Sequence, residues 1–408
     1  MRSLFARLSG NAARVATVRV VGGALTLLSL FVGLHYLGAR EFGRSVILLS
    51  AGMLLALPST SAERLVLRLA AGGDLLSANH LVRRFSGLAG ITVLVGAIIS
   101  AVMLSLDFTT WHAPLVVATV AASTSEVALR QARARATGAL MWGQVPNELV
   151  RPTLTIVGYI VASFFPRDFQ ASLAVAVPSI FTLLVILAAP RPRVSDDSIS
   201  RATPPTSQVR QLTGFIAIST VAAFLERGYP LVVGATAGED QVAIIAIGLR
   251  VLQVGLFGQA LSLYYFSPSL ASALKRDRLG PEVSTITQNI RRVSTASILP
   301  VIAVCLTAPS WATAPLGEVA DVDDVLRISA VAIVAQVATG PAQAFLTMSD
   351  GEHFVAATYF VGLTVGALVF WLMPSHGGVE ALSSITISYT VFAIGQIWFA
   401  RQRLGRWV

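Results

Sequence analysis

"FLERGYPLVVGATAGEDQVAIIAIGLR", residues 224–250, poses the central question of this chain. Two apolar runs flank a short acidic turn at Gly238–Asp240, the pattern of two membrane-spanning helices joined as a hairpin. Yet Glu226, Arg227 and Arg250 lie inside the apolar runs. An ionised side chain at the centre of a bilayer costs at least roughly 2.5–3.5 kcal/mol, so such residues usually face a cavity or a partner. The stretch therefore predicts a membrane hairpin with a polar interior.

The composition extends this pattern to the whole chain. Of its 408 residues 54% are hydrophobic and only 12% are charged, whereas a soluble domain carries about 25% charged residues. Apolar runs recur along the entire length, and a soluble fold of this size cannot bury so many all-apolar helices. The sequence predicts an all-α integral membrane protein.

Twelve apolar runs are candidates for spans of about 20 residues each. Their approximate cores are 18–37, 45–66, 87–106, 113–131, 147–165, 171–189, 213–236, 242–266, 294–313, 326–347, 353–373 and 379–400.

The charges of the loops predict the topology. Most cations fall in alternate loops and at both ends of the chain, while the other loops are acidic or nearly neutral, as at Glu239 and Asp240. The positive-inside rule then places both termini in the cytoplasm, which agrees with an even number of spans. The net charge of +9 is explained by this orientation and does not require nucleic acid.

Metal and disulfide chemistry find little support. Cys305 is the only cysteine, and the five histidines are scattered without ligand spacing. We expect no catalytic residue, no metal and no cofactor other than a coupling ion, H⁺ or Na⁺.

The longest polar break divides the chain. Residues 191–211, rich in Pro, Ser and charge, predict a flexible cytoplasmic linker between an N-terminal lobe of six helices (1–190) and a C-terminal lobe of six helices (212–408). A weak repeat supports the division, because Leu37–Gly52 and Ala237–Leu252 both show a glycine, a charged turn and an apolar helix. Repeats of this kind are common in secondary transporters.

Several of these segments resemble a known family. "YLGAREFGRSVILLSAGMLLALPSTSAERLVLRLAA", "LRQARARATGALMWGQVPNELVRPTLTIVGYIVA", "FLERGYPLVVGATAGEDQVAIIAIGLRV" and "YYFSPSLASALKRDRLGPEVSTITQNIRRV" are similar to segments of polysaccharide and O-antigen flippases. These flippases belong to the multidrug/oligosaccharidyl-lipid/polysaccharide exporter superfamily. The family usually carries Asp where this chain has Glu226.

The resemblance implies two six-helix lobes around a central cavity in the bacterial cytoplasmic (inner) membrane. It implies flipping of an undecaprenyl-pyrophosphate-linked oligosaccharide for lipopolysaccharide, capsule or exopolysaccharide synthesis. A polysaccharide polymerase and a chain-length regulator would be the protein partners.

The intramembrane charges are the first candidate substrate-binding residues. At about 1.5 Å per residue, Glu226 lies ~20 Å and Arg250 ~15 Å from the turn that joins their helices. Pro230 cannot donate to the carbonyl of residue 226 and therefore predicts a kink at the charges. Two readings stay open: Arg227 and Arg250 bind a lipid pyrophosphate while Glu226 holds them or a coupling cation, or the three residues form a structural ion pair.

The second candidate set is cytoplasmic. Glu126 and Arg130 are spaced i, i+4, and Glu148 and Arg151 are spaced i, i+3, so each pair lies on one helix face. Glu126, Arg130 and Arg151 either receive the pyrophosphate headgroup or are interface charges whose long side chains reach the headgroup region.

Other functions remain in competition. A cation-coupled multidrug exporter of the same fold would need fewer phosphate-seeking arginines in its cavity. A membrane polysaccharide polymerase or glycosyltransferase would need acid/base groups on a long outer loop, and the outer loops here are short. A transport-inactive scaffold in a cell-wall complex is the fourth possibility.

Overall fold

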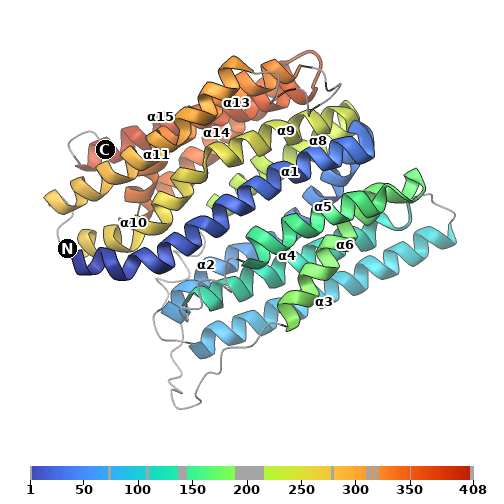
Figure 1. Cartoon of the computed structure of the whole chain (residues 1–408), viewed down its shortest axis with the longest axis horizontal. Coiled ribbons are helices and arrows are strands. Elements are labelled where there is room, and N and C mark those ends of the chain that lie inside the picture. The colour runs from blue at the N-terminus through green and yellow to red at the C-terminus, as the bar shows by residue number, and fades with distance from the viewer. Residues whose placement is uncertain are drawn as a thin grey trace. The chain divides into compact units, whose positions relative to one another are not determined.

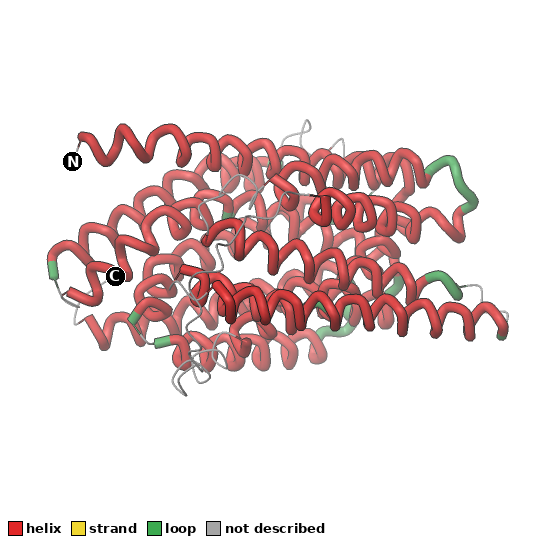
Figure 2. Tube along the Cα trace, turned by 90° about the horizontal axis from the view of Figure 1, so that it is seen from below, coloured by secondary structure: helices red, strands yellow, loops and turns green. Residues whose placement is uncertain are grey.

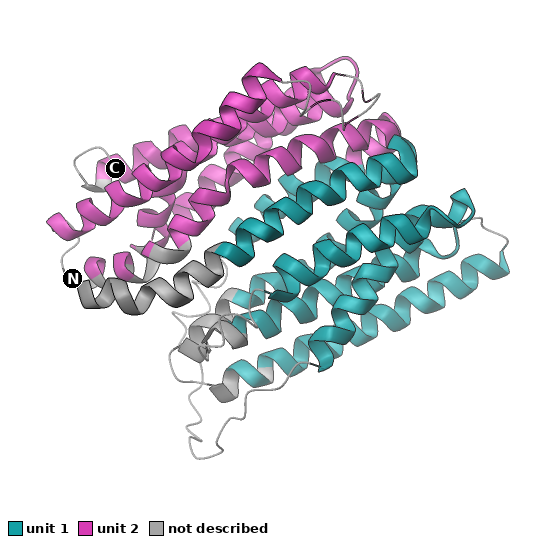
Figure 3. Cartoon of the chain, in the orientation of Figure 1, with its two compact units in different colours: residues 1–231 teal, residues 232–408 magenta. Residues whose placement is uncertain are grey.

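A computed structural model describes residues 2–71, 75–106, 110–136, 145–188, 216–276, 280–308, 321–349 and 351–404, together with residues 313, 316 and 319. Figure 2 shows that these described residues form helices joined by short loops. Their contacts divide the chain into two compact units, Met1–Leu231 and Val232–Val408, coloured separately in Figure 3. The linker 191–211 lies outside the described residues, so the predicted lobe boundaries stay a prediction.

The helices follow the order of the predicted spans along the chain (Figure 1). In unit 1 they are α1 (Arg2–Leu55), α2 (Leu57–Ala71), α3 (Leu75–Ser105), α4 (Ala113–Ala136), the π-helical turn η1 (Pro146–Val150), α5 (Arg151–Ala162), α6 (Arg167–Ala188) and the π-helical turn η2 (Phe224–Gly228). Helix α8 (Tyr229–Thr236) follows η2 and contains the boundary between the units.

The remaining helices belong to unit 2. They are α9 (Glu239–Gly255), α10 (Phe257–Arg276), α11 (Pro281–Thr307), α13 (Val322–Met348), α14 (Glu352–Leu372) and α15 (Gly378–Leu404). Within the described residues, eight helices are long and apolar enough to cross a membrane, or nine if α9 and α10 form one bent span. The prediction of an all-α multi-pass membrane protein is confirmed.

Each unit has its own buried core. In unit 1, α1 packs against α4, α5 and α6, and a cluster around Val66, Val82 and Leu129 joins α2, α3 and α4. In unit 2, α13 and α15 pack along each other, and α9 buries every residue from 242 to 249. Helix α3 by contrast exposes large apolar side chains such as Leu94 and Ile98, as expected for a surface that faces lipid.

Two predicted spans are broken, which hydropathy did not show. The span predicted at 242–266 is divided between α9 and α10, which meet at an angle of 44°. The span predicted at 45–66 is likewise divided at Ala56, between α1 and α2. Hydropathy measures apolar length and does not detect where the backbone leaves the helix, so it located both spans without their breaks.

These breaks strengthen the internal repeat. Gly38 has φ 75° and ψ 167°, and Gly238 has φ 96° and ψ 169°, a region of backbone space that is essentially open to glycine alone. A Cβ added at either glycine would have no atom within 4 Å, so the requirement is conformational rather than steric. Each helix then breaks the same number of residues after its glycine, at Ala56 and at Leu256. The two halves share this hairpin geometry.

Candidate functional site

Two π-helical turns carry the charged motifs of unit 1. Glu148 lies in η1 and Glu226 with Arg227 in η2. A proline follows each glutamate by four residues, at Pro152 and Pro230. Because proline has no N–H, neither can donate the α-helical hydrogen bond to its glutamate's carbonyl. The helix irregularity predicted at Pro230 is present, in the form of the π turn η2. Isolated π turns are frequent at functional sites.

Both π turns pack against helix α1. At η1 the approach is very close: a Cβ added at Gly22 would lie 2.4 Å from the carbonyl oxygen of Glu148. The amide of Arg151 donates to the carbonyl of Pro146, which is the i→i+5 bond that defines the turn. Helix α1 therefore holds η1 through backbone contact, and the side chains that flank η1 start from a fixed position.

The Glu126–Arg130 pair is confirmed as an ion pair on α4. Arg130 Nε donates to Glu126 Oε2 at 2.7 Å, and its Nη1 donates to the carbonyl of Ile186 at 3.2 Å. The side chain of Glu126 is 8% exposed and that of Arg130 is 25% exposed. The carboxylate is therefore held inside the unit, while the guanidinium ties α4 to the end of α6 and keeps part of its surface open.

Arg151 reaches the same helix from α5. Its Nη2 donates to Thr124 Oγ1 at 3.4 Å, one helical turn or less from Glu126. This contact brings Arg151 to the segment of α4 that carries Glu126, and Thr124 is a neighbour that the sequence did not identify. Arg130 and Arg151 together place two guanidinium groups around one segment of α4.

The Glu226–Arg227 pair has a different environment. Both side chains are half-buried, and neither forms a hydrogen bond or ion pair with another described residue. Adjacent residues on a helix do not face each other, which explains why the two do not neutralise one another. Two charged groups in an apolar span without protein partners are costly, so a polar ligand or water is their expected counterpart.

Arg250 lies in unit 2, on α9. Its Nη1 donates to Gln253 Oε1 at 2.8 Å within the same helix. The meeting of Arg250 with the Glu226–Arg227 pair stays a prediction.

One acidic residue and one proline escaped the sequence reasoning. Glu41 is 6% exposed, and its carboxylate accepts a hydrogen bond from Arg44 at 2.9 Å. It follows Gly38 of α1 by three residues, and its i, i+3 spacing to Arg44 was a signal visible in the sequence. Pro152 repeats the spacing of Pro230 to its glutamate, and comparing the two motifs directly would have predicted η1.

On the loop before α4, His112 packs its ring against Trp111 and Phe169. Burial lowers the pKa of His112 below 6.5, and this effect exceeds the opposing influence of Asp168, whose hydrogen bond and negative charge raise it. The neutral imidazole is the favoured form in the folded chain.

Known structures share this arrangement of helices. A crystal structure of a MATE mutant aligns with 97% of this chain and 95% of its own, with a TM-score of 0.63 at 17% identity. An outward-facing multidrug resistance MATE family transporter of the MOP superfamily gives 0.60 at 14% identity over the same shares. A MOP superfamily transporter from Pyrococcus furiosus gives 0.64 at 15% identity, again over 97% and 95%.

The chain has the MATE transporter fold. That fold places twelve transmembrane helices in two lobes, which agrees with the twelve predicted spans. No protein-family model and no curated protein matches the chain. At identities of 14–17%, the structural likeness establishes the fold alone.

Proposed function

We propose that this chain is a transporter that flips an undecaprenyl-pyrophosphate-linked oligosaccharide across the bacterial cytoplasmic membrane by alternating access. The observation that carries the proposal is the set of arginines in the apolar helices of unit 1: Arg130, Arg151 and Arg227. A guanidinium group forms paired hydrogen bonds with phosphate oxygens and stays charged at all physiological pH values. Arginine is therefore well suited to bind a pyrophosphate headgroup inside a membrane.

The carboxylates have supporting roles in this proposal. Glu126 orients Arg130 through the 2.7 Å ion pair. Glu226, which has no partner among the described side chains, binds the coupling H⁺ or Na⁺ or receives Arg227 during the cycle. Arg250 completes the substrate contacts from α9. No residue is assigned a catalytic role.

The transport cycle follows from the two-lobed organisation. Residues 1–190 and 212–408 rock about the linker 191–211, with both termini in the cytoplasm, and the substrate passes to a polysaccharide polymerase and a chain-length regulator downstream. The η1 and η2 turns are the places where a helix bends at least cost, because the regular hydrogen bonding is already interrupted there.

A multidrug exporter is the competing function, because some of the matching structures are multidrug transporters. For the Pyrococcus furiosus transporter, reverse polarity of the binding pocket suggests a different function. The apolar helices of unit 1 supply arginines, and these favour an anionic substrate here.

The test is reconstitution of the chain in liposomes with a fluorescent undecaprenyl-pyrophosphoryl oligosaccharide. Translocation is measured as the fraction protected from a membrane-impermeant quencher, under an imposed H⁺ or Na⁺ gradient. We expect translocation by the native chain, loss in Arg227→Ala and retention in Arg327→Ala, whose exposed side chain lies outside the site. Lack of translocation under every gradient, or transport of cationic dyes instead, would refute the proposal.

A further inference from the structure

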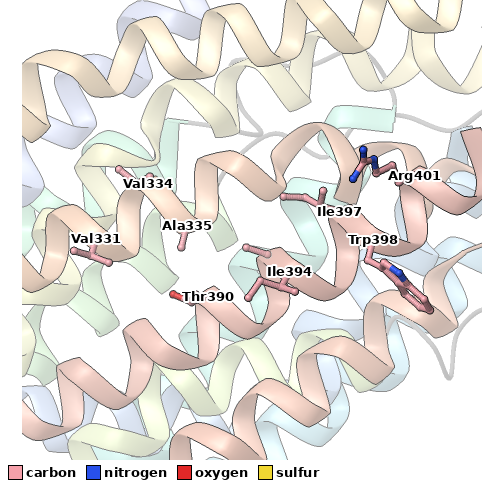
Figure 4. Close-up of a pocket in the computed structure, with 9 residues that line it drawn as sticks. Val331, Val334, Ala335, Thr390, Ile394, Ile397, Trp398 and Arg401 are labelled. Carbon is pink, nitrogen blue, oxygen red and sulfur yellow. The ribbon is translucent and has the colours of Figure 1, made fainter. Parts of the chain in front are cut away.

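An apolar groove runs between α13 and α15 in unit 2 (Figure 4). Val331 and Val334 line it from α13, and Ile394 and Trp398 line it from α15. Arg401 lies at one end of the groove beside Trp398, and Val331 lies at the other. We call this feature the α13–α15 groove; its volume is about 520 Å³.

The walls of the groove are apolar and accessible. Val331 is 56% exposed and Ile394 is 67% exposed. The one hydroxyl in the lining, that of Thr390, donates to the carbonyl of Thr386 in its own helix at 2.9 Å. It therefore leaves its methyl group for contact with a ligand. Both helices are long and apolar enough to span a membrane, so the apolar walls of the groove suit a hydrocarbon chain.

The length of the groove matches one leaflet of a bilayer. From Thr390 to Arg401 the helix rises about 16 Å at ~1.5 Å per residue. The hydrocarbon core of a bilayer is roughly 30 Å thick, so one leaflet contributes about half of that. One acyl chain of a phospholipid matches the length of such a groove, whereas a long polyprenyl chain is longer than the groove.

The positive charge at one end of the groove indicates which lipid headgroup the groove binds. Arg401 is exposed at the last turns of α15, where its cation lies at headgroup depth. Tryptophan is enriched at the same depth in membrane proteins, and Trp398 is beside Arg401. A basic side chain at the mouth of a groove between spanning helices favours an anionic lipid headgroup.

We propose that the α13–α15 groove binds one anionic glycerophospholipid, with an acyl chain between α13 and α15 and the phosphate at Arg401. This lipid is a bound structural ligand of unit 2 and differs from the transported substrate. The proposal does not depend on the transport activity.

The test uses the full chain, purified in detergent and stripped of lipid. Phosphatidylglycerol and phosphatidylcholine with identical chains are added separately, and binding is followed by native mass spectrometry and by the rise in melting temperature. We expect one tightly bound phosphatidylglycerol and much weaker phosphatidylcholine binding. Arg401→Gln should weaken phosphatidylglycerol binding by about fivefold, the loss of one cation at the headgroup.

Two further variants separate the parts of the groove. Ala335→Phe fills the groove from α13 and should abolish the binding of both lipids, while Arg401→Lys keeps the charge and should retain the preference. Arg291→Gln, an exposed arginine on α11 outside the groove, is the matched control. Equal binding of the two lipids, unchanged binding in Ala335→Phe, or displacement of phosphatidylglycerol by equimolar polyprenyl phosphate would each overturn the proposal.

Discussion

Removal of Arg130 is the most informative perturbation of unit 1, because it leaves Glu126 charged and enclosed. The side chain of Glu126 is 8% exposed and its ion pair spans 2.7 Å. Breaking a buried pair by deleting one partner costs about 3–5 kcal/mol. Arg130 itself is 25% exposed, so water screens part of the loss and we expect the lower end of that range for Arg130→Met.

The expected loss converts into a measurable shift. A unit of this size loses about 2–4 °C of melting temperature per kcal/mol, so Arg130→Met should melt roughly 6–12 °C below the native chain in detergent. The exposed pair Asp324–Arg327, 3.7 Å apart with side chains 61% and 60% exposed, is the control. Its Arg327→Gln variant should cost less than about 1 kcal/mol.

A double variant then separates structure from function. Glu126→Gln with Arg130→Met removes both charges, and replacing both partners of a buried pair is often close to neutral. We expect most of the melting temperature to return. Flipping that stays absent in this stable double variant would assign the Glu126–Arg130 pair to transport rather than to stability. If Arg130→Met melts within a degree or two of Arg327→Gln, or if the double variant melts no higher than the single one, the burial argument is wrong.

Three other predictions follow from local geometry. Gly22→Ala should lower stability by about 1–3 kcal/mol because its Cβ meets a backbone carbonyl of η1, while Gly23→Ala, with open space around it, should not; equal melting temperatures would contradict the close packing. Gly38→Ala should cost about 1–3 kcal/mol through backbone strain alone, whereas Gly87→Ala, with a helical backbone and open space, should be neutral or slightly stabilising in the same assay. Burial lowers the pKa of His112 below 6.5, so the unfolded chain binds its proton first and stability should fall as the pH drops from 6.5 through the lowered pKa; His112→Asn should remove that part of the pH dependence of melting, and an unchanged profile would refute it.

The spans could be predicted from sequence because transfer into lipid depends on each residue's own hydropathy. The Glu126–Arg130 pair could also be predicted from sequence, since i, i+4 spacing places both side chains on one helix face without tertiary information. The break at Ala56 had a signal in Pro58, which cannot donate the helical hydrogen bond to the carbonyl of Leu54. The break at Leu256 has no proline beside it and depends on how the helices pack.

The sequence predicted the charged residues of the candidate site, but not the backbone geometry and helix contacts that position them. Pro230 indicated an irregular helix at Glu226, but the π turn and its packing on α1 depend on contacts between distant segments. Thr124 is a similar case, because nothing in its own neighbourhood reveals that Arg151 reaches it from another helix. The placement of Arg250 relative to Arg227 remains a prediction for the same reason.

The shared hairpin geometry has a consequence for how this chain can change over evolution. The segments 38–56 and 238–256, each running from a glycine to a helix break, differ in most side chains but not in length. Substitutions in these segments are therefore expected to be tolerated far more readily than a single insertion or deletion, and exchanging one segment for the other would preserve the register of everything that follows.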